Sequence, residues 1–333
     1  MIKFYYSIFV LLFVLITSCN NTKENAPHFP KEEILEPELM SLQGITDPMR
    51  VDVKHPFLIL QNTSKMNDSI FHIYDLTTSR LKYVFGVRGE GPNEFVLPWM
   101  LRSSFPDLLI EDKNSFYRYS IGKDGVPISK DTIKPLYTNN LSEASFINDS
   151  LFVVDAQYTG PYVHLCSIKD EMPQKSWEYR NPDIMDYFID PNRGELNASD
   201  RRIVFCYKYK KRIDFMDTQF NLIKSVKYDY TEPTNIAEKP GEDKISYTDA
   251  YLGKRYLYAM FMGVTENEHA VNLWCGAYLE VYDLDGNPVK RFILKGKRPI
   301  YFGVDEETFT LYGVIPDGNP EDHLLVYKLK GLS

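Results

Sequence analysis

The sequence is poor in the residues that most metal, redox and nucleic-acid sites require. Its 333 residues include 4 cysteines and 6 histidines, with no Cys-x-x-Cys, Gly-x-Ser-x-Gly or His-Glu-x-x-His motif. The 38 basic residues are outnumbered by 46 acidic ones, and an acidic chain repels phosphate backbones. We therefore expect no nucleic-acid partner and no cofactor, and the spacing of these residues assigns no metal site.

Helical patterning is also weak. Alanine is scarce, whereas the 24 tyrosines and 20 phenylalanines give a bias that favours strands. Only residues 183–188 suggest a single turn of helix. Beyond residue 16, no apolar run approaches the roughly 20 residues of a membrane span. The sequence therefore predicts a β-rich domain that lies outside the bilayer.

The N-terminus has the pattern of an export signal. Lys3 precedes an apolar run over residues 4–16, and Thr17-Ser18-Cys19 follows. The residues at 16–19 (Ile-Thr-Ser-Cys) resemble the lipobox of bacterial lipoproteins. That resemblance implies a diacylglycerol on Cys19 and cleavage before it. The alternatives are an uncleaved N-terminal anchor, or a plain secretory signal with a chance cysteine.

This reading divides the chain into three parts. Residues 1–18 are the expected signal peptide, 19–36 the lipidated cysteine with a flexible tether, and 37–333 the folded domain. Asn20 is not the Asp that resembles an inner-membrane retention signal, so the expected location is the outer membrane, on either face. Without residues 1–18, which contain one Lys, the net charge is about −9.

Three cysteines remain for the domain. Cys166, Cys206 and Cys275 lie in β-rich segments far apart in the sequence. One disulfide between two of them is compatible with an oxidising compartment. Small buried thiols are the interpretation that the apolar surroundings favour.

A repeated pattern runs through the rest of the chain. Each unit has a short apolar or alternating strand, a polar turn, a strand rich in Tyr and Phe, another turn and a third strand. Leading strands recur roughly every 45 to 50 residues, the size of a four-stranded propeller blade. They begin near Phe57, Leu108, Leu151, Ile203, Tyr256 and Ile300. The sequence therefore predicts an all-β fold, a six-bladed β-propeller with four-stranded blades.

The chain before the first unit has a place in this prediction. Residues 39–53 can complete a blade shared between the two termini, which would close the ring. The alternative architecture is a β-sandwich or an open pair of β domains, which has no reason to repeat near 45 residues.

The sharpest local motif covers residues 86–95. It contains Gly86, Gly89, Gly91, Pro92, Glu94 and Phe95. A phosphate-binding glycine loop would need a helix directly after it, but Phe95-Val96-Leu97-Pro98 does not begin one. We therefore interpret the motif as a tight structural connection that leaves the first blade, with glycine where the backbone needs positive φ.

The motif carries a resemblance to a known family. A strand that ends in Phe-Gly, followed by Arg-Gly-x-Gly-Pro-x-Glu-Phe, resembles the first inter-blade connection of the TolB-like six-bladed propeller lipoproteins of Bacteroidetes. Tyr74-Asp75-Leu76 is similar to a strand end of that group, whereas Lys54-His55-Pro56 departs from its usual polar turn. The resemblance implies a six-bladed ring and a lipid anchor. It implies no catalytic residues.

Two functions are compatible with these observations. The first is a non-enzymatic binding module on a lipid tether, with a protein or glycan partner in the cell envelope. The second is a cation-dependent envelope hydrolase or lyase with its site in the central channel. For the second, the candidate ligands are acidic residues at strand ends, which more often cap turns. They are Asp75, Asp112, Asp155, Asp283 and Asp305.

Two smaller features accompany these hypotheses. Trp99 and Trp274 lie in segments that could offer aromatic anchors to a partner, although core packing is their commoner use. Asp68-Ser69-Ile70, Asp131-Thr132-Ile133 and Asp149-Ser150-Leu151 resemble the Asp-Ser/Thr-aliphatic O-glycosylation signal of Bacteroidetes.

Overall fold

The structure of the chain, a computed structural model, consists almost entirely of β-strands. It describes residues 27–45, 47–63, 69–91, 94–102, 105–156, 160–184, 186–228, 241–271 and 277–332. Within these ranges, no helix has both the length and the apolar character needed to cross a bilayer.

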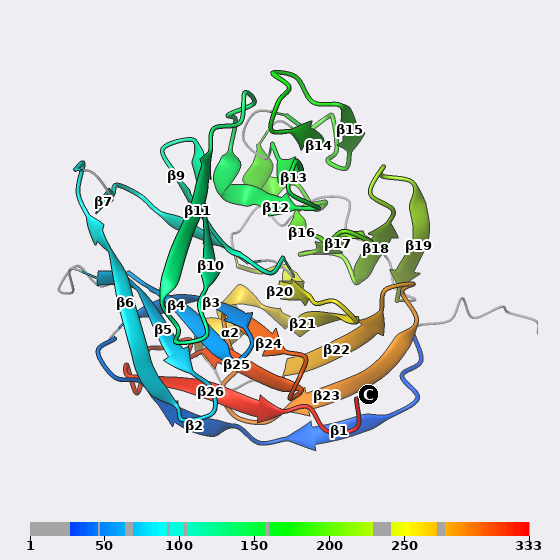
Figure 1. The fold of residues 1–333 in the computed structure, drawn as a ribbon. Coiled ribbons are helices and arrows are strands. Elements are labelled where there is room, and N and C mark those ends of the chain that lie inside the picture. The colour runs from blue at the N-terminus through cyan, green and yellow to red at the C-terminus, as the bar shows by residue number, and fades with distance from the viewer. Residues whose placement is uncertain are drawn as a thin grey trace, which may run out of the picture.

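Six sheets follow one another around a common centre (Figure 1). One strand of each sheet faces that centre. These innermost strands are β3 (Pro48–Lys54), β8 (Trp99–Leu101), β12 (Ala144–Phe146), β16 (Gly194–Ala198), β20 (Lys244–Leu252) and β24 (Phe302–Asp305). Contacts of β3 with β24, β24 with β20, β20 with β16 and β16 with β12 place five of these strands side by side around the centre. We number the blades 1 to 6 in the chain order of their innermost strands, from β3 in blade 1 to β24 in blade 6.

Outward from the centre, each blade adds three antiparallel strands. The second strands are β4 (Phe57–Asn62), β9 (Leu108–Asp112), β13 (Leu151–Asp155), β17 (Ile203–Tyr207), β21 (Tyr256–Thr265) and β25 (Thr310–Val314). The third strands are β5 (Ser69–Asp75), β10 (Ser115–Ile121), β14 (Tyr162–Ser167), β18 (Arg212–Met216), β22 (Ala277–Asp283) and β26 (His323–Lys328). The outermost strands are β6 (Arg80–Arg88), β11 (Pro127–Ile133), β15 (Lys175–Glu178), β19 (Leu222–Lys227), β23 (Pro288–Leu294) and, in blade 6, β2 (Glu38–Ser41).

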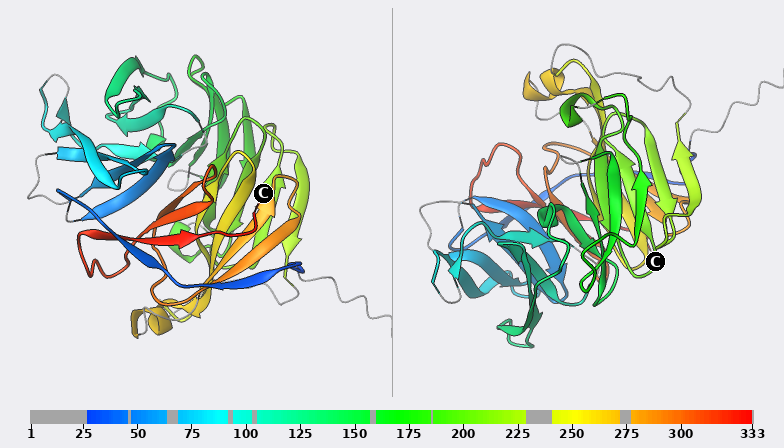
Figure 2. Two further views of the ribbon diagram at one scale, coloured as in Figure 1. Left: turned by 60° about the horizontal axis from the view of Figure 1, so that its bottom comes forward. Right: turned by 90° about the horizontal axis from the view of Figure 1, so that it is seen from above.

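A few short elements lie outside this pattern. Two strands extend blade edges in parallel: β1 (Glu32–Leu35) along β23, and β7 (Glu94–Phe95) along β6. The helical elements are η1 (Leu141–Glu143), η2 (Tyr187–Ile189) and α2 (Glu266–Val271). Helix α2 projects beyond the sheets at one side of the ring (Figure 2).

The two ends of the described chain close the ring together. Strand β2, from the N-terminal segment, pairs antiparallel with β26, and Leu39 lies opposite Leu325. The amide of Leu42 continues this ladder by donating to the Asp322 carbonyl at 2.6 Å. Blade 6 therefore contains one strand from near the start and three from the end of the chain, which leaves no open sheet edge inside the ring.

The core lies between the blades. Six large apolar clusters each join two neighbouring blades. Between blades 2 and 3, the ring of Phe116 packs edge-on against Phe146 and Phe152, with centroids 4.8 and 5.4 Å apart. Strands such as β4 and β17 are buried along their full length, because both faces of a blade are covered by neighbours.

The structure confirms the predicted six-bladed propeller and corrects which strand begins each blade. The expected leading strands near Phe57, Leu108, Leu151, Ile203 and Tyr256 are second strands, and only the sixth unit was placed on an innermost strand. Innermost strands escaped notice because several are short; β8 and β12 have three residues each. The expected closing segment at 39–53 divides accordingly: β2 completes blade 6, and β3 is the innermost strand of blade 1.

The propeller also begins before the expected boundary at residue 37. Strand β1 pairs with β23, and Phe29 packs edge-on against Tyr282 at a centroid distance of 5.4 Å. Phe29 belongs to the cluster between blades 4 and 5. The described chain therefore joins the ring at its outer edge, where the N-terminal segment, blue in Figure 1, begins.

Candidate functional site

The central channel has two mouths with a cavity at each. Each blade has four antiparallel strands, so its first strand starts and its fourth strand ends at the same face of the ring. The next blade therefore starts at that face too, and all innermost strands run in the same direction. Their first residues meet at one mouth and their last residues at the other. The cavity at the first mouth has a volume of about 500 Å³, and that at the second about 510 Å³.

An ion pair lies across the middle of the channel. Arg102, directly after β8 in blade 2, donates to both carboxylate oxygens of Asp249 on β20 in blade 5, at 2.5 and 2.8 Å. Nη1 of Arg102 also donates to the Phe302 carbonyl at 3.1 Å. Burial alone would lower the pKa of Arg102, but the Asp249 carboxylate raises it above its usual value. Arg102 therefore keeps its positive charge, and its contact with Asp249 holds opposite blades together.

A second arginine lies beside this pair. Arg50 on β3 stacks its guanidinium 3.8 Å from the ring centroid of Trp99 and donates to the Met100 carbonyl at 3.1 Å. Burial, with the nearby Arg102 charge, lowers the pKa of Arg50 to about 10. The Trp99 side chain therefore packs inside the ring against Arg50, which is the commoner use expected from the sequence.

We call the cavity at the first mouth the Glu195 cavity. It is lined by Tyr187, Arg193, Gly194, Glu195, Lys208, Ile245, Thr248, Met262, Glu266, His269, Arg298, Ile300 and Tyr301. These residues come from the starts of the innermost strands of blades 4, 5 and 6, from η2, and from α2 with the chain near it. Polar and aromatic side chains from blades 4, 5 and 6 therefore converge there.

Glu195 is the second residue of β16 and has an unusual environment. Within the described part of the chain, its carboxyl has no hydrogen-bond partner. Burial, the largest cause, and the nearby Asp249 carboxylate, the next, raise the pKa of Glu195 to about 8. Arg102 and Arg50 lower this pKa in part. The carboxyl is therefore predominantly protonated at pH 7 and can donate as well as accept a hydrogen bond.

Two of the cationic side chains in the Glu195 cavity have neighbours inside it. Lys208 Nζ lies 3.2 Å from Glu266 Oε1. Arg298 Nη2 lies 3.0 Å from His269 Nε2. Burial and the Arg298 charge lower the pKa of His269, so that ring is neutral at pH 7. The cavity consequently has more positive than negative charge.

Arg193 is the third cation of this cavity. It donates from Nη1 to the Phe188 carbonyl at 3.0 Å, and its guanidinium lies 4.6 Å from the Tyr187 ring centroid. Its buried Nε has no hydrogen-bond partner. Stacking thus fixes the plane of the guanidinium while part of its donor capacity is unused.

In the cavity at the second mouth, the His55 cavity, several polar groups are bonded within the protein. His55 Nδ1 lies 3.0 Å from Asp305 Oδ2. The Glu306 carboxylate accepts from the amides of Lys254 and Arg255 at 2.8 and 3.1 Å, and Arg255 donates back to the Glu306 carbonyl. These groups therefore satisfy one another without a ligand.

The strand-end acids proposed as cation ligands are occupied in turns and blade contacts. Asp75, Asp283 and Asp305 accept from backbone amides two or more residues later. Asp112 accepts from the amides of Val96 and Leu97 across blades 1 and 2, and Asp155 accepts from Tyr179 Oη at 2.7 Å. The described ranges contain no group of three or more His, Cys, Asp or Glu residues arranged to hold a metal ion.

The described residues of the 86–95 motif lie at the outer edge of blade 1, where β7 pairs with β6. Gly86 in β6 has φ +76°, and a Cβ there would lie 2.9 Å from Phe71 Cδ2. The Glu94 carboxylate accepts from the Gly91 amide at 2.7 Å and fills the space where a Cβ on Gly89 would lie. Phe95 packs on Phe71 at 5.7 Å.

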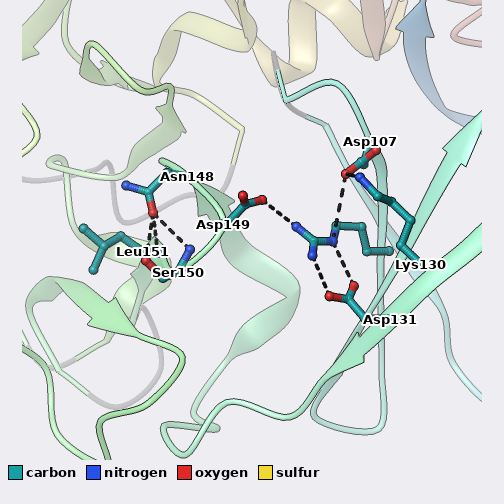
Figure 3. Close-up of polar contacts among 8 residues, drawn as sticks. Asp107, Lys130, Asp131, Asn148, Asp149, Ser150 and Leu151 are labelled. Atoms are coloured by element: carbon teal, nitrogen blue, oxygen red, sulfur yellow. Dashed lines mark hydrogen bonds and ion pairs between the residues drawn. The ribbon is translucent and has the colours of Figure 1, made fainter.

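Two of the Asp-Ser/Thr-aliphatic triplets lie side by side at the boundary of blades 2 and 3 (Figure 3). Arg118 on β10 joins them, because it contacts Asp131 at 2.5 Å and Asp149 at 2.5 Å. The Asn148 side chain accepts from the amides of Ser150 and Leu151, both at 3.0 Å. Both triplet aspartates are therefore held in an exposed inter-blade ion-pair network.

Several sequence-based predictions lie on other parts of the chain. Cys166 and Cys206 are free, buried thiols. Burial raises the pKa of Cys166 to about 12, which makes that thiol unreactive at neutral pH. Cys19, Cys275, Trp274, Asp68 and Pro92 lie outside the described residues.

The sequence did not assign the residues at the centre of the ring. Arg50, Arg102, Glu195 and Asp249 come from four blades, and no local spacing links them. One signal was present for Glu195, since it follows Gly194 at the start of a strand. A Cβ on Gly194 would lie 2.3 Å from the Cys206 carbonyl oxygen, so this glycine marks a close backbone approach.

Known proteins agree with this architecture. The family model described as TolB-like 6-blade propeller-like matches residues 28–307. A solved member of the DUF4221 family from Bacteroides vulgatus has a TM-score of 0.50 and 14% identity, covering 92% of this chain and 98% of that one. Similarity at this identity shows the fold alone.

Two further solved structures align more loosely. A chain of the Mitotic Checkpoint Complex has a TM-score of 0.44 and 8% identity, covering 91% of this chain and 93% of that one. Hsv2 from Kluyveromyces lactis has a TM-score of 0.38 and 14% identity, covering 81% and 78%. No curated protein matches the sequence.

Proposed function

We propose, from the premise that this chain belongs to the TolB-like 6-blade propeller-like family, that it is a non-enzymatic binding module of the cell envelope. A lipid on Cys19 holds it at a membrane. The mouth of the ring that contains the Glu195 cavity receives a protein or glycan partner. A propeller suits this role because its loops converge on a rigid rim around one opening.

One contrast between the two mouths carries the proposal. The two cavities have nearly equal volumes, but their polar groups differ in how far they are satisfied. The Glu306 and His55 side chains of the second cavity are bonded within the protein. At the first mouth, the Glu195 carboxyl and the Arg193 Nε have no hydrogen-bond partner within the described residues. Such groups are stabilised when a partner supplies the missing bonds.

The position of the N-terminal segment supports a tethered arrangement. Phe29 packs on Tyr282 at the outer edge of the ring between blades 4 and 5. A tether that joins the ring at this edge leaves both mouths of the channel accessible. A partner can therefore reach the Glu195 cavity while the lipid remains in a membrane.

The proposal is tested by a crosslinked pull-down from membranes. Tagged wild-type protein is compared with Cys19→Ala, which loses the lipidated thiol, and with Asn20→Ala, which keeps it. We expect an envelope partner with wild type and Asn20→Ala, and reduced recovery with Cys19→Ala. An empty pull-down from well-expressed, membrane-bound wild-type protein would overturn the proposal.

A further inference from the structure

The charge of the Glu195 cavity favours an anionic ligand. The chain as a whole has a net charge of −8, yet Arg193, Lys208 and Arg298 all line this one cavity. Glu266 offsets one of these charges through its ion pair with Lys208. Glu195 offsets little at pH 7, because its raised pKa keeps it mostly protonated. Positive charge is thus concentrated at one mouth of an acidic protein.

The shape of the cation site favours a carboxylate. Arg193 has a planar guanidinium whose orientation is fixed over the Tyr187 ring, and its Nε is buried without a hydrogen-bond partner. A planar carboxylate matches such a fork through two parallel hydrogen bonds. A spherical inorganic anion would be attracted by the charge of Arg193, but its shape would not match the planar guanidinium.

Groups that recognise hydroxyls lie in the same cavity. The Glu195 carboxyl and the Tyr301 hydroxyl both lack a hydrogen-bond partner within the described residues. A protonated carboxyl and a phenol can each donate and accept one bond, as a sugar hydroxyl does. A bare anion would leave both groups unsatisfied, so the ligand has a polyhydroxylated body as well as a charge.

The size and closure of the cavity limit the ligand. Its volume of about 500 Å³ is in the range of small-molecule sites and accommodates one or two sugar rings. The Arg102 guanidinium lies 6.0 Å from the Tyr301 ring centroid, and its ion pair with Asp249 spans the channel there. A ligand that enters at this mouth therefore stops inside the ring and does not pass through it.

We propose that the Glu195 cavity binds an acidic sugar, either free or as the end of a glycan chain, with its carboxylate at Arg193 and its hydroxyls at Glu195 and Tyr301. This inference rests on the proposed binding function and specifies the chemistry of the partner. It places the carboxylate near the mouth and the sugar ring toward the centre of the propeller.

Isothermal titration calorimetry of the full folded domain tests the inference, with glucuronate, glucose and inorganic phosphate as separate probes. We expect saturable binding of glucuronate, and at least tenfold weaker binding of both glucose and phosphate. Arg193→Gln should weaken glucuronate binding about tenfold, which is the effect of one lost charge-assisted hydrogen bond. Glu195→Leu removes the neutral hydrogen-bonding group and should weaken glucuronate binding by a similar factor. Arg255→Gln, in the His55 cavity, is the matched control and should bind as wild type does.

Each other outcome overturns the inference. Equal binding of phosphate and glucuronate would indicate a simple anion site, and equal loss in Arg255→Gln would place the ligand elsewhere. A thermal unfolding scan confirms that each variant is folded. If glucuronate fails to bind while the crosslinked pull-down still recovers a partner, the acidic-sugar inference is wrong and the binding-module proposal stands. If both assays are negative, both are wrong.

Discussion

Arg102 in blade 2 and Asp249 in blade 5 form a bidentate ion pair across the centre of the ring, at 2.5 and 2.8 Å. The pair also fixes blade 6, because the Phe302 amide donates to Asp249 at 3.1 Å and its carbonyl accepts from Arg102 at 3.1 Å. Both side chains are buried, at 10% and 1% exposure. Neighbouring blades are held by apolar clusters, whereas these opposite blades are held by charge.

Removing one member of this pair should destabilise the protein strongly. Asp249→Ala leaves the Arg102 charge buried and uncompensated, which we expect to lower the free energy of unfolding by about 3–5 kcal/mol. Urea unfolding measures this change. The matched control is Glu36→Ala, which breaks the exposed pair with Lys295 and should cost less than about 1 kcal/mol. Equal effects of the two substitutions would contradict the buried cross-ring pair.

Ring closure by β2 gives a second prediction. Met40 is 9% exposed and packs in the cluster between blades 6 and 1, whereas its neighbour Leu39 is 57% exposed. We expect Met40→Ala to lower the free energy of unfolding by about 2 kcal/mol and Leu39→Ala by less than about 0.5 kcal/mol. Thermal unfolding of the two variants measures the difference. The register of β2 on β26 is refuted if Leu39→Ala is the more damaging change.

The glycine motif gives a third prediction, which separates backbone strain from steric conflict. Gly86 and Gly44 have nearly the same φ, +76° and +77°. A Cβ on Gly86 would lie 2.9 Å from the buried Phe71 ring, but one on Gly44 meets Leu81 at 3.6 Å. We expect Gly44→Ala to cost about 1 kcal/mol from φ alone, and Gly86→Ala clearly more. Equal losses in urea unfolding would show that Phe71 moves aside freely.

The blade period could be predicted from sequence, but not the order of strands within a blade. Second strands such as β4 (Phe57–Asn62) are buried on both faces and stand out as apolar runs. Innermost strands such as β8 (Trp99–Leu101) are short and adjoin polar channel residues, so they do not. The count of six follows from the period, whereas the position of the channel depends on strands that hydropathy does not reveal.

The candidate site could not be predicted from local sequence patterns, for a related reason. Glu195 and Arg50 lie in blades 4 and 1, and only ring closure brings them to one channel. Neither belongs to a motif with fixed spacing. By contrast, Gly89, Gly91 and Glu94 of the 86–95 motif contact one another locally, and a short sequence pattern includes all three.

Glu195 should make the stability of the protein depend on pH. Burial raises its pKa in the folded protein to about 8, against about 4.3 in an unfolded chain. The folded state then binds more protons between these values, so the free energy of unfolding falls as pH rises from about 4.3 to 8. Wild type and Glu195→Gln are compared by urea unfolding across this range. We expect a difference that declines with pH and levels off above 8.

The charged groups around Glu195 set the size of this effect. Arg50 and Arg102 favour its ionised form, and Glu143 and Asp249 oppose it. The glutamine variant keeps all four, so it isolates the titration of Glu195. A difference between the two proteins that is constant from pH 4 to 9 would show that Glu195 is already ionised in the folded state.

The most direct test of the account is site-specific photo-crosslinking in membranes at two matched positions. Phe188, 58% exposed, lies beside Arg193 at the mouth of the Glu195 cavity, and Leu222, 57% exposed, lies on the outer strand β19. A photoreactive phenylalanine analogue replaces each in turn. The account predicts a discrete crosslinked partner from position 188 and none from position 222. A partner captured only from position 222, or from neither position, would contradict it.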